Sequence, residues 1–433
     1  MKLTISSLLV LLLVVFSAPL FVVIITGASV GWFSTDIDIQ DFAYQTYFTI
    51  MGGFTDSASA SVLKTLPLFA FAGFLLSESN TADRLIRLSK AALGWMPGGL
   101  VLVSLLTCAF FTMLTGGSGV TIVAVGGLLY PALVKSNYNE RFSLGLITTS
   151  GSLGLLLPPA IPLILFSVIA QQMDINVEIT DLFLAGILPA FLMIVALFGW
   201  GLWANRNQDI PLVAFRFGEF RKALWETKWE LLIPVVIIGG IATGKVVISE
   251  IAAVTAMYVL IVTVFVQKEI PISKIPEIAL NSMKMVGGIL LILAVALVFS
   301  AYLIDAEIPS KLLEWIQAHV DKKWQFLILL NILLLFLGAI LDIFAALVIM
   351  VPLLLPVAVG FGVDPVHLAI IFVANMQIGY FTPPVGMNLF IASYRFKKSI
   401  GELYRATLPY LFLLFGVVLL ITYIPWLSLV FVN

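Results

Sequence analysis

The residues from Gly338 to Ser393 read GAILDIFAALVIMVPLLLPVAVGFGVDPVHLAIIFVANMQIGYFTPPVGMNLFIAS, and they give the first indication of the fold. They place an acid, Asp342, an amide and a TPPVG break in surroundings apolar enough to lie in lipid. Pro383 and Pro384 remove hydrogen bonds from a helix, and inside a bilayer the freed groups must be satisfied by protein, water or a bound ion. Breaks of this kind tend to mark binding sites.

An earlier part of the chain repeats this pattern. One constant shift, without gaps, moves Pro131 onto Pro356, Gly154 onto Gly379, Pro158-Pro159 onto Pro383-Pro384, and Gly117 in TGGSG onto Asp342 in GAILD. Several prolines and a glycine that agree at one offset indicate an internal duplication.

The composition predicts an all-α polytopic membrane protein. Of 433 residues, 61% are hydrophobic and 11% are charged, whereas a soluble domain has roughly half apolar and about a quarter charged residues. The expected surroundings are therefore a lipid bilayer, and no basic patch suited to nucleic acid is present. The single cysteine, Cys108, excludes an intramolecular disulfide and a cysteine-based metal cluster.

The distribution of charge predicts how the first part of the chain crosses the membrane. The apolar run from Leu8 to Ile25 is too long for a signal h-region of roughly 7 to 15 residues, so we expect a first transmembrane helix that the chain keeps. The segment from Gly27 to Thr65 is acidic with no Lys or Arg before Lys64, which is typical of a non-cytoplasmic segment. Basic residues after the next span, between Arg84 and Lys90, indicate the cytoplasm.

The next region predicts a re-entrant hairpin. An apolar stretch from Gly98 to Lys135 is interrupted by TGGSG, and basic residues flank both of its ends. The residues from Phe142 to Gln172 then cross outward with a break at Pro158-Pro159, and an acidic loop follows. A basic segment from Asn205 to Glu230 predicts a cytoplasmic, amphipathic connector.

The second copy has the opposite orientation, because its hairpin is entered from the outer face and its broken helix runs inward to Arg395. This is the inverted-repeat arrangement of secondary transporters. The expected divisions are first-repeat scaffold helices at 1–97, a first hairpin and broken helix at 98–172, connecting scaffold helices and a cytoplasmic loop at 173–284, a second-repeat scaffold helix at 285–322, a second hairpin and broken helix at 323–398, and a C-terminal scaffold helix at 399–433.

The candidate binding residues lie at the two hairpin tips and the two breaks. An acid within an apolar hairpin is costly and usually has a functional partner, which makes Asp342 a candidate cation ligand, although a structural pairing is the alternative. Freed carbonyls and side-chain oxygens can complete a site for a hard cation such as Na⁺. The candidate Na⁺ ligands are Gly116, Gly117, Ser118, Pro158, Asp342, Gly379 and Thr382.

A second set of polar residues beside the same breaks is assigned to the substrate. These residues supply hydroxyl and amide groups, and they are Thr115, Ser118, Ser150, Ser152, Asn375, Gln377 and Asn388. These residues could instead be structural. In the first copy small residues would allow close helix packing, and in the second copy polar side chains would supply hydrogen bonds at a helix end.

Several other activities are excluded or disfavoured. The segment GGIATGKV at Gly239 to Val246 resembles a phosphate-binding loop, but Val246 stands where a hydroxyl for Mg²⁺ is needed. His319 and His367 lack metal-ligand spacing and are expected at the outer hydrophilic edge. No catalytic constellation is visible, so the chain is expected not to be an enzyme and to need no cofactor beyond Na⁺ as a coupling ion.

The chain resembles the large membrane (permease, DctM-like) subunit of the tripartite ATP-independent periplasmic (TRAP) transporters. The motifs that carry the resemblance are LPLFAFAG from Leu66, GWMPGGL from Gly94, TGGSG, GLLLPPAIPLILF from Gly154, LLIPVVIIGGIATGKVVISEIAAV from Leu231, and GAILD through TPPVG. In the family the first hairpin tip usually reads SGSS and the first break IPPS, whereas this chain has GGSG and LPPA.

The resemblance implies an elevator-type, Na⁺-coupled importer of an organic acid such as a C4-dicarboxylate or sialic acid, in which hairpins and broken helices move. It implies location in the bacterial inner membrane and two partners, a periplasmic substrate-binding protein and a small four-helix membrane subunit, here expected to be a separate chain. The sequence has no Lys or Arg close to either break, which also favours capture of substrate by a separate protein. A stand-alone ion-coupled anion symporter and a channel-like permease remain the alternatives.

Overall fold

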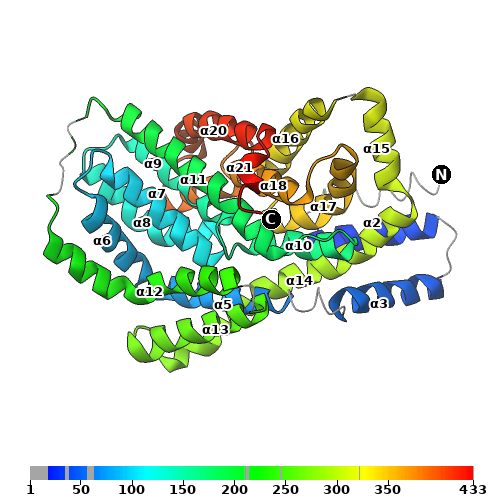
Figure 1. Cartoon of the computed structure of the whole chain (residues 1–433), viewed down its shortest axis with the longest axis horizontal. Coiled ribbons are helices and arrows are strands. Elements are labelled where there is room, and N and C mark those ends of the chain that lie inside the picture. The colour runs from blue at the N-terminus through cyan, green and yellow to red at the C-terminus, as the bar shows by residue number, and fades with distance from the viewer. Residues whose placement is uncertain are drawn as a thin grey trace.

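The computed structural model describes residues 18–34, 39–55, 63–208, 210, 214–243, 246–320 and 322–432, and these residues contain helices and no β-strand (Figure 1). The helices that form the first half are α2 (Leu20–Ser34), α3 (Ile39–Thr55), α5 (Thr65–Glu78), α6 (Thr81–Leu93), α7 (Gly99–Thr115), α8 (Ser118–Lys135), α9 (Glu140–Ser150), η1 (Leu153–Leu156), α10 (Ile161–Gln172) and α11 (Ile179–Ala204).

The second half of the chain is also helical. They are α12 (Phe217–Thr243), α13 (Ile248–Ile261) with the π-helical η2 (Val262–Val266), η3 (Ile272–Lys274), α14 (Ile275–Asp305), α15 (Ile308–His319), α16 (Lys323–Ile340), α17 (Ile343–Gly360), α18 (Pro365–Gly379), α19 (Met387–Phe396), α20 (Ile400–Tyr423) and α21 (Trp426–Leu429). Among the described residues, seven helices are long and apolar enough to cross a membrane, or eight if the bent pair formed by α9 and α10 is one span.

The first hairpin turns between α7 and α8 within the TGGSG segment. Helix α7 ends at Gly116, whose φ of +68° lies in the left-handed region, and the Gly116 N–H donates to the Thr112 carbonyl at 2.7 Å. Glycine adopts this conformation without strain, and it is common just after a helix end. A side chain here would also meet Ile161 of α10, at 2.7 Å from its nearest carbon. The tip therefore turns tightly against the first broken helix, and α8 starts at Ser118.

The break in the first broken helix begins earlier in the chain than the sequence predicted. The proline pair predicted a break at Pro158-Pro159, but α9 already ends at Ser150, a short 3₁₀ turn follows, and α10 starts only at Ile161. The two helical parts are inclined by 42°. Gly151 and Ser152 thus belong to the break, which extends about two helical turns towards the start of α9.

The second hairpin and broken helix repeat this order. Helix α17 starts at Ile343 after an N-cap at Asp342, and α18 starts after an N-cap at Asp364 with Pro365 in its first turn, where proline is well tolerated. Residues 380–386 separate α18 from α19. The peptide bonds Pro158-Pro159 and Pro383-Pro384 are both cis.

The two units also agree in their helix ends. The shift that moves Pro158 onto Pro383 moves the bounds of α8, Ser118–Lys135, onto the bounds of α17, Ile343–Gly360. Helix formation thus starts and stops at corresponding positions although the two sequences differ, with Gly117 and Asp342 at the corresponding N-caps.

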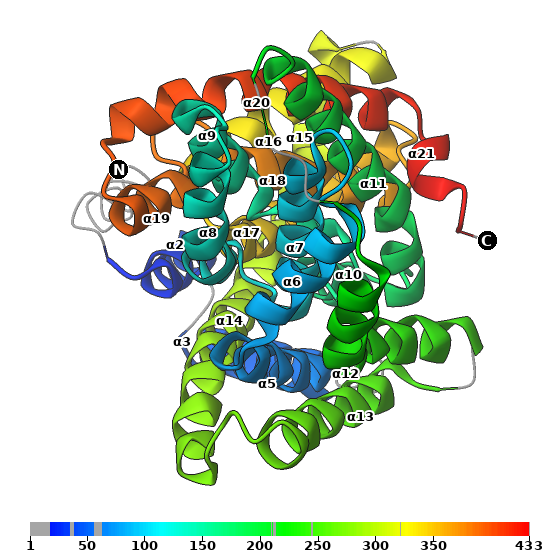
Figure 2. The ribbon, with the colours of Figure 1, turned by 90° about the vertical axis from the view of Figure 1, so that its left-hand side faces the viewer.

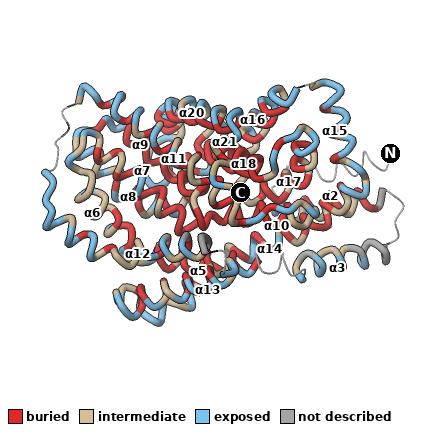
Figure 3. Tube along the Cα trace, viewed as in Figure 1, coloured by how far each residue is buried: buried red, intermediate tan, exposed pale blue. Residues whose placement is uncertain are grey.

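The two hairpin-and-break units form the buried centre of the molecule. Every residue from Val366 to Gly379 of α18 and from Ile161 to Ala170 of α10 is buried, whereas α3 and α15 at the edges are largely exposed (Figure 3). Helices α5, α12, α13 and α14 lie along one side, with α20 on the opposite side in both views (Figures 1 and 2). The first break is therefore buried almost throughout, whereas the second break is exposed at Pro384 and Val385.

Other sequence predictions need adjustment. Helix α14 starts at Ile275, ten residues before the expected Met285, and α12 incorporates much of the basic connector. His367 was predicted at the outer edge, but it is 1% exposed, with Nδ1 3.2 Å from Ser428 Oγ and Nε2 3.2 Å from the Thr422 carbonyl. Most of the predicted span Leu8–Ile25 precedes residue 18 and lies outside the described residues.

Candidate functional site

The first break contacts the end of α18, just before the second break, in the core. Ser152, in the first break, donates its hydroxyl to the Gln377 carbonyl of α18 at 3.2 Å and to the Thr149 carbonyl at 3.2 Å. Ser152 and Gln377 are both fully buried. They are 225 residues apart, which is also the distance along the chain from Pro158 to Pro383. Corresponding positions of the two copies therefore meet directly.

A second contact joins the first hairpin tip to the helix after the second break. Ser118 Oγ donates to Asn388 Oδ1 at 2.8 Å. Asn388 in turn donates its backbone N–H to the Tyr380 carbonyl at 2.9 Å and its Nδ2 to the Thr148 carbonyl at 3.4 Å. Both side chains are buried. Asn388 thus connects three segments, α8, α9 and the second break.

Two glycines allow each break to approach the first arm of its own hairpin. A Cβ at Gly154 would lie 2.2 Å from the Ala109 carbonyl oxygen and 2.4 Å from the Met113 nitrogen. A Cβ at Gly379 would lie 2.4 Å from the Gly338 Cα. Real Cβ atoms do not approach backbone this closely, so these positions accept only glycine. The same contact occurs in both copies, because the shift relates Gly154 to Gly379 and Met113 to Gly338.

Asp342 has a structural role that does not use its whole carboxylate. Its Oδ1 accepts hydrogen bonds from the backbone N–H groups of Phe344 at 2.9 Å and Ala345 at 3.1 Å, which caps α17. The side chain is only half-buried. The neighbouring Ile343 N–H donates to the Tyr380 hydroxyl at 2.9 Å, so the hairpin tip lies against the second break. The sequence indicated the position of this acid but not the cap.

Other candidate residues donate to backbone carbonyls three or four residues earlier in the chain. The hydroxyls of Thr115, Ser150 and Thr382 donate to the carbonyls of Phe111, Ile147 and Ile378. Gly116 and Pro158 are buried, whereas Gly117 and Thr382 are half-buried. These residues lie at or beside the hairpin tips and the breaks.

Asn375 belongs to a different polar group. Its Nδ2 donates to Asn331 Oδ1 at 2.7 Å and to the Ile371 carbonyl at 2.8 Å, and the Thr422 hydroxyl donates to the same Asn331 oxygen at 3.2 Å. This group joins α16, α18 and α20. The sequence analysis missed Asn331, although a single amide in the apolar run KWQFLILLNILLLFLGAI is a signal that could have identified it.

The region also contains acceptors that no described group satisfies. Gln377 Oε1, Asn375 Oδ1 and Thr149 Oγ1 are buried side-chain oxygens without a hydrogen-bond partner. A buried polar group without a partner is costly, and such groups cluster where a ligand or ion binds. The described residues contain no group of three His, Cys, Asp or Glu side chains that could hold a metal ion.

One basic residue lies nearer to this region than the sequence suggested. Arg395, on α19, donates Nε to the Val123 carbonyl of α8 at 2.9 Å, although it is exposed. It is therefore held on the same two helices as Ser118 and Asn388. A cation that follows a break by about two helical turns is the sequence signal that could have marked it.

Comparison with known proteins shows which class of protein has this geometry. The family model described as "Tripartite ATP-independent periplasmic transporter, DctM component" matches residues 5–427. The C4-dicarboxylate TRAP transporter large permease protein DctM of Rhodobacter capsulatus is 36% identical over 383 residues, which cover 86% of this chain and 87% of that protein. The isethionate TRAP transporter permease protein DctMQ of Oleidesulfovibrio alaskensis is 32% identical over 395 residues, which cover 91% of this chain and 60% of that protein.

A solved structure shares the fold. The crystal structure of the Alcanivorax borkumensis YdaH transporter has a TM-score of 0.65 at 18% identity and covers 90% of this chain and 89% of that chain. The apolar helices and the matches to transporter permeases thus define a multi-pass membrane protein of the transporter class. Within that class, the chain belongs to the DctM family, the large membrane subunits of TRAP transporters. Its relatives are named as transporter permeases, which are not enzymes.

Proposed function

We propose that this chain is the large permease subunit of a Na⁺-coupled secondary transporter that imports an organic acid. The observation that carries the proposal is the pair of contacts Ser118–Asn388 and Ser152–Gln377, which join the two hairpin-and-break units. Units joined in this way move as one body, as an elevator-type mechanism requires. The corresponding bounds of α8 and α17 support the idea that an inverted repeat builds this body.

The coupling ion is proposed to be Na⁺, held at the hairpin tips and breaks. In the second copy the ligands are Asp342, Thr382 and the Gly379 carbonyl, and in the first they are Gly116, Gly117, Ser118 and Pro158. Only Asp342 Oδ1 is used in capping α17, which leaves Oδ2 for a cation. A hard cation prefers carboxylate, hydroxyl and carbonyl oxygens of this kind.

The substrate is proposed to be a small organic acid. The relatives are named for a C4-dicarboxylate and for isethionate, which are both anions with oxygen-rich ends. Hydroxyl and amide donors suit such groups, and Thr115, Ser118, Ser150, Ser152, Asn375, Gln377 and Asn388 supply them near the breaks. Arg395, held across α8 and α19, is a further donor for an anion.

The proposed partners follow from family membership. They are a periplasmic substrate-binding protein and a small membrane subunit in a bacterial inner membrane. The charge distribution supports a cytoplasmic position for Arg216 and an outer position for Asp181 and Asp305. A cysteine at position 216 in a Cys108→Ala background should resist impermeant thiol reagents in intact cells, and labelling from outside would reverse this orientation.

Transport in proteoliposomes tests the function. With this chain and its small subunit, we expect clear uptake when the binding protein and an inward Na⁺ gradient are both present without ATP. We expect little uptake of free substrate at micromolar concentrations. Efficient uptake without the binding protein would indicate a stand-alone symporter, and uptake that does not saturate would indicate a channel. A requirement for ATP hydrolysis would contradict secondary transport altogether.

A further inference from the structure

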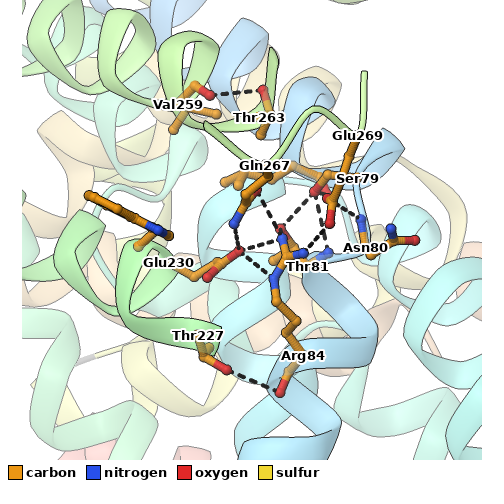
Figure 4. A network of polar contacts seen from close by, with 12 residues as sticks. Ser79, Asn80, Thr81, Arg84, Thr227, Glu230, Val259, Thr263, Gln267 and Glu269 are labelled. Atoms are coloured by element: carbon orange, nitrogen blue, oxygen red, sulfur yellow. Dashed lines mark hydrogen bonds and ion pairs between the residues drawn. The ribbon is translucent and has the colours of Figure 1, made fainter. Parts of the chain in front are cut away.

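Helices α6 and α12 are fixed to each other by polar contacts at one side of the molecule (Figure 4). Arg84 Nε donates to Glu230 Oε1 at 2.8 Å, and Arg84 also pairs with Glu269 in the loop after η2. The Thr227 hydroxyl donates to the Arg84 carbonyl at 3.3 Å. One turn further along, Arg87 Nη1 pairs with Glu226 Oε2 at 2.5 Å. These contacts hold the two helices at a defined spacing.

Beyond these pairs, the same helices enclose a basic pocket. It has a volume of about 280 Å³, and its charged lining residues are Arg87, Lys90, Arg216, Lys222 and a single acid, Glu219. The other lining residues are three alanines, Ala91, Ala214 and Ala223, whose small side chains leave the space open. We call this the α6–α12 pocket.

The positive charge of the α6–α12 pocket is not neutralised by the chain. Arg87 pairs with Glu226, and Arg216 pairs with Glu219 at 3.3 Å. In the described part of the chain, Lys90 and Lys222 form no ion pair, and both are exposed. Two ammonium groups therefore face this opening with no carboxylate partner, a charge arrangement that attracts an anion.

The segments that line the α6–α12 pocket also carry aromatic side chains near the lining residues in sequence. The rings of Trp95, just after α6, and Phe215 meet edge to face with centroids 6.5 Å apart. On α12, Phe217 and Trp225 are 66% and 71% exposed, and Lys228 Nζ lies 3.5 Å from the Trp225 ring centroid. Exposed aromatic and basic side chains mixed on one helix are typical of the interface between lipid headgroups and acyl chains. The first half of α12 therefore fits the membrane surface.

We propose that the α6–α12 pocket binds the phosphate headgroup of an anionic phospholipid. Basic pockets between helices on the cytoplasmic side of membrane proteins are suited to such headgroups. The lysines supply point charges for the phosphate, and the exposed Phe217 and Trp225 supply an apolar surface for the acyl chains. The bound lipid bridges α6 and α12 at the end of their ion pairs and stabilises this side of the molecule. This role is separate from substrate transport.

The test uses the double substitution Lys90→Gln and Lys222→Gln in the full chain. These two lysines have no carboxylate partner, so their replacement leaves no acid unpaired, whereas replacement of Arg87 would isolate Glu226. Native mass spectrometry of the purified protein measures binding of phosphatidylglycerol and of phosphatidylcholine. We expect the parent to prefer phosphatidylglycerol and the double variant to bind it about tenfold more weakly, since each basic residue near an anionic headgroup adds to affinity.

A matched control carries the same change of charge elsewhere. Lys135→Gln with Lys284→Gln replaces two exposed lysines that form no ion pair in the described residues, and it should bind phosphatidylglycerol like the parent. Circular dichroism checks that both variants keep their helices. Excess inorganic phosphate should not displace the lipid, because the acyl chains contribute to binding. Equal phosphatidylglycerol binding by parent and double variant, or full displacement by inorganic phosphate, would overturn the proposal.

Discussion

The Ser152 hydroxyl donates to the Gln377 carbonyl at 3.2 Å, and these two residues occupy corresponding positions in the two halves of the chain. The contact is fully buried and lies where the first break crosses α18. A residue can meet its own counterpart only near an axis that relates the two halves. The two hairpin-and-break units are thus joined at the centre of the molecule, and the Ser118–Asn388 bond adds a second connection.

Replacement of Ser152 should weaken this junction. Ser152→Ala removes the hydroxyl and leaves a buried carbonyl without one of its partners, which costs about 1 kcal/mol. We expect a lower midpoint of thermal unfolding in detergent and slower transport. Ser150→Ala is the matched control, because the contacts of the Ser150 hydroxyl, with the Ile147 carbonyl and the Cys108 thiol, both lie within the first unit. Equal effects of the two substitutions would mean that the contact between the breaks does not contribute to stability.

The Ser118–Asn388 pair should behave as one unit in a double-mutant cycle. Ser118→Ala and Asn388→Ala each break the same hydrogen bond, so the double variant should lose less stability than the sum of the single variants, with a coupling of about 1 kcal/mol. The unfolding midpoint in detergent gives the stabilities. Ser104→Ala combined with Asn388→Ala is the control, because the Ser104 hydroxyl donates to the Leu100 carbonyl in α7. Strict additivity for Ser118 and Asn388 would contradict the coupling.

The glycines at the breaks should not tolerate even a methyl group. Gly154→Ala and Gly379→Ala place a Cβ against backbone atoms of the hairpins, and overpacking of this kind costs about 1–3 kcal/mol. We expect both variants to lose transport and to unfold at lower temperature. Gly199→Ala and Gly416→Ala are the controls, since nothing lies within 4 Å of a Cβ at either position. Helix propensity should leave these controls as stable as the parent or slightly more stable.

Two substitutions of Asp342 separate the effect of its charge from its effect as a helix cap. Asparagine caps a helix about as well as aspartate, so Asp342→Asn should keep the start of α17 while removing the charge. We expect an unchanged unfolding midpoint and a weaker dependence of uptake on Na⁺ concentration. Asp342→Ala should lose the cap as well, at a cost of about 1 kcal/mol. An unchanged Na⁺ dependence in Asp342→Asn would show that the acid is only structural.

The network around Arg84 predicts that the stability of the folded protein falls as the pH is lowered into the acid range. Burial opposes ionisation of Glu269, but hydrogen bonds from Arg84 and the Asn80 backbone hold its pKa below the usual value. This stabilisation is fully present above the unfolded pKa of about 4.3 and is lost as pH falls through the lower folded pKa. We expect the unfolding midpoint of the parent to fall towards that of Glu269→Gln in this acid range. Glu314→Gln, which replaces an exposed acid on α15, should follow the parent at every pH.

The sequence by itself determined the class, the two hairpins and the two breaks. Gly116, Asp342 and the proline pairs act through local backbone chemistry, which is the same wherever the segment lies in the fold. For this reason the starts of α8 and α17 and the position of the second break could be predicted from the chain alone. The duplicated positions were visible for the same reason.

Only the tertiary structure decided which polar groups meet. Ser118 and Asn388 are 270 residues apart, and Asn331 joins Asn375 and Thr422 from three different helices. Such partners depend on how the helices cross, and neither periodicity nor local propensity contains that information. The burial of His367 and the early end of α9 at Ser150 have the same origin, because neighbouring helices there supply hydrogen-bond partners that the sequence places far away.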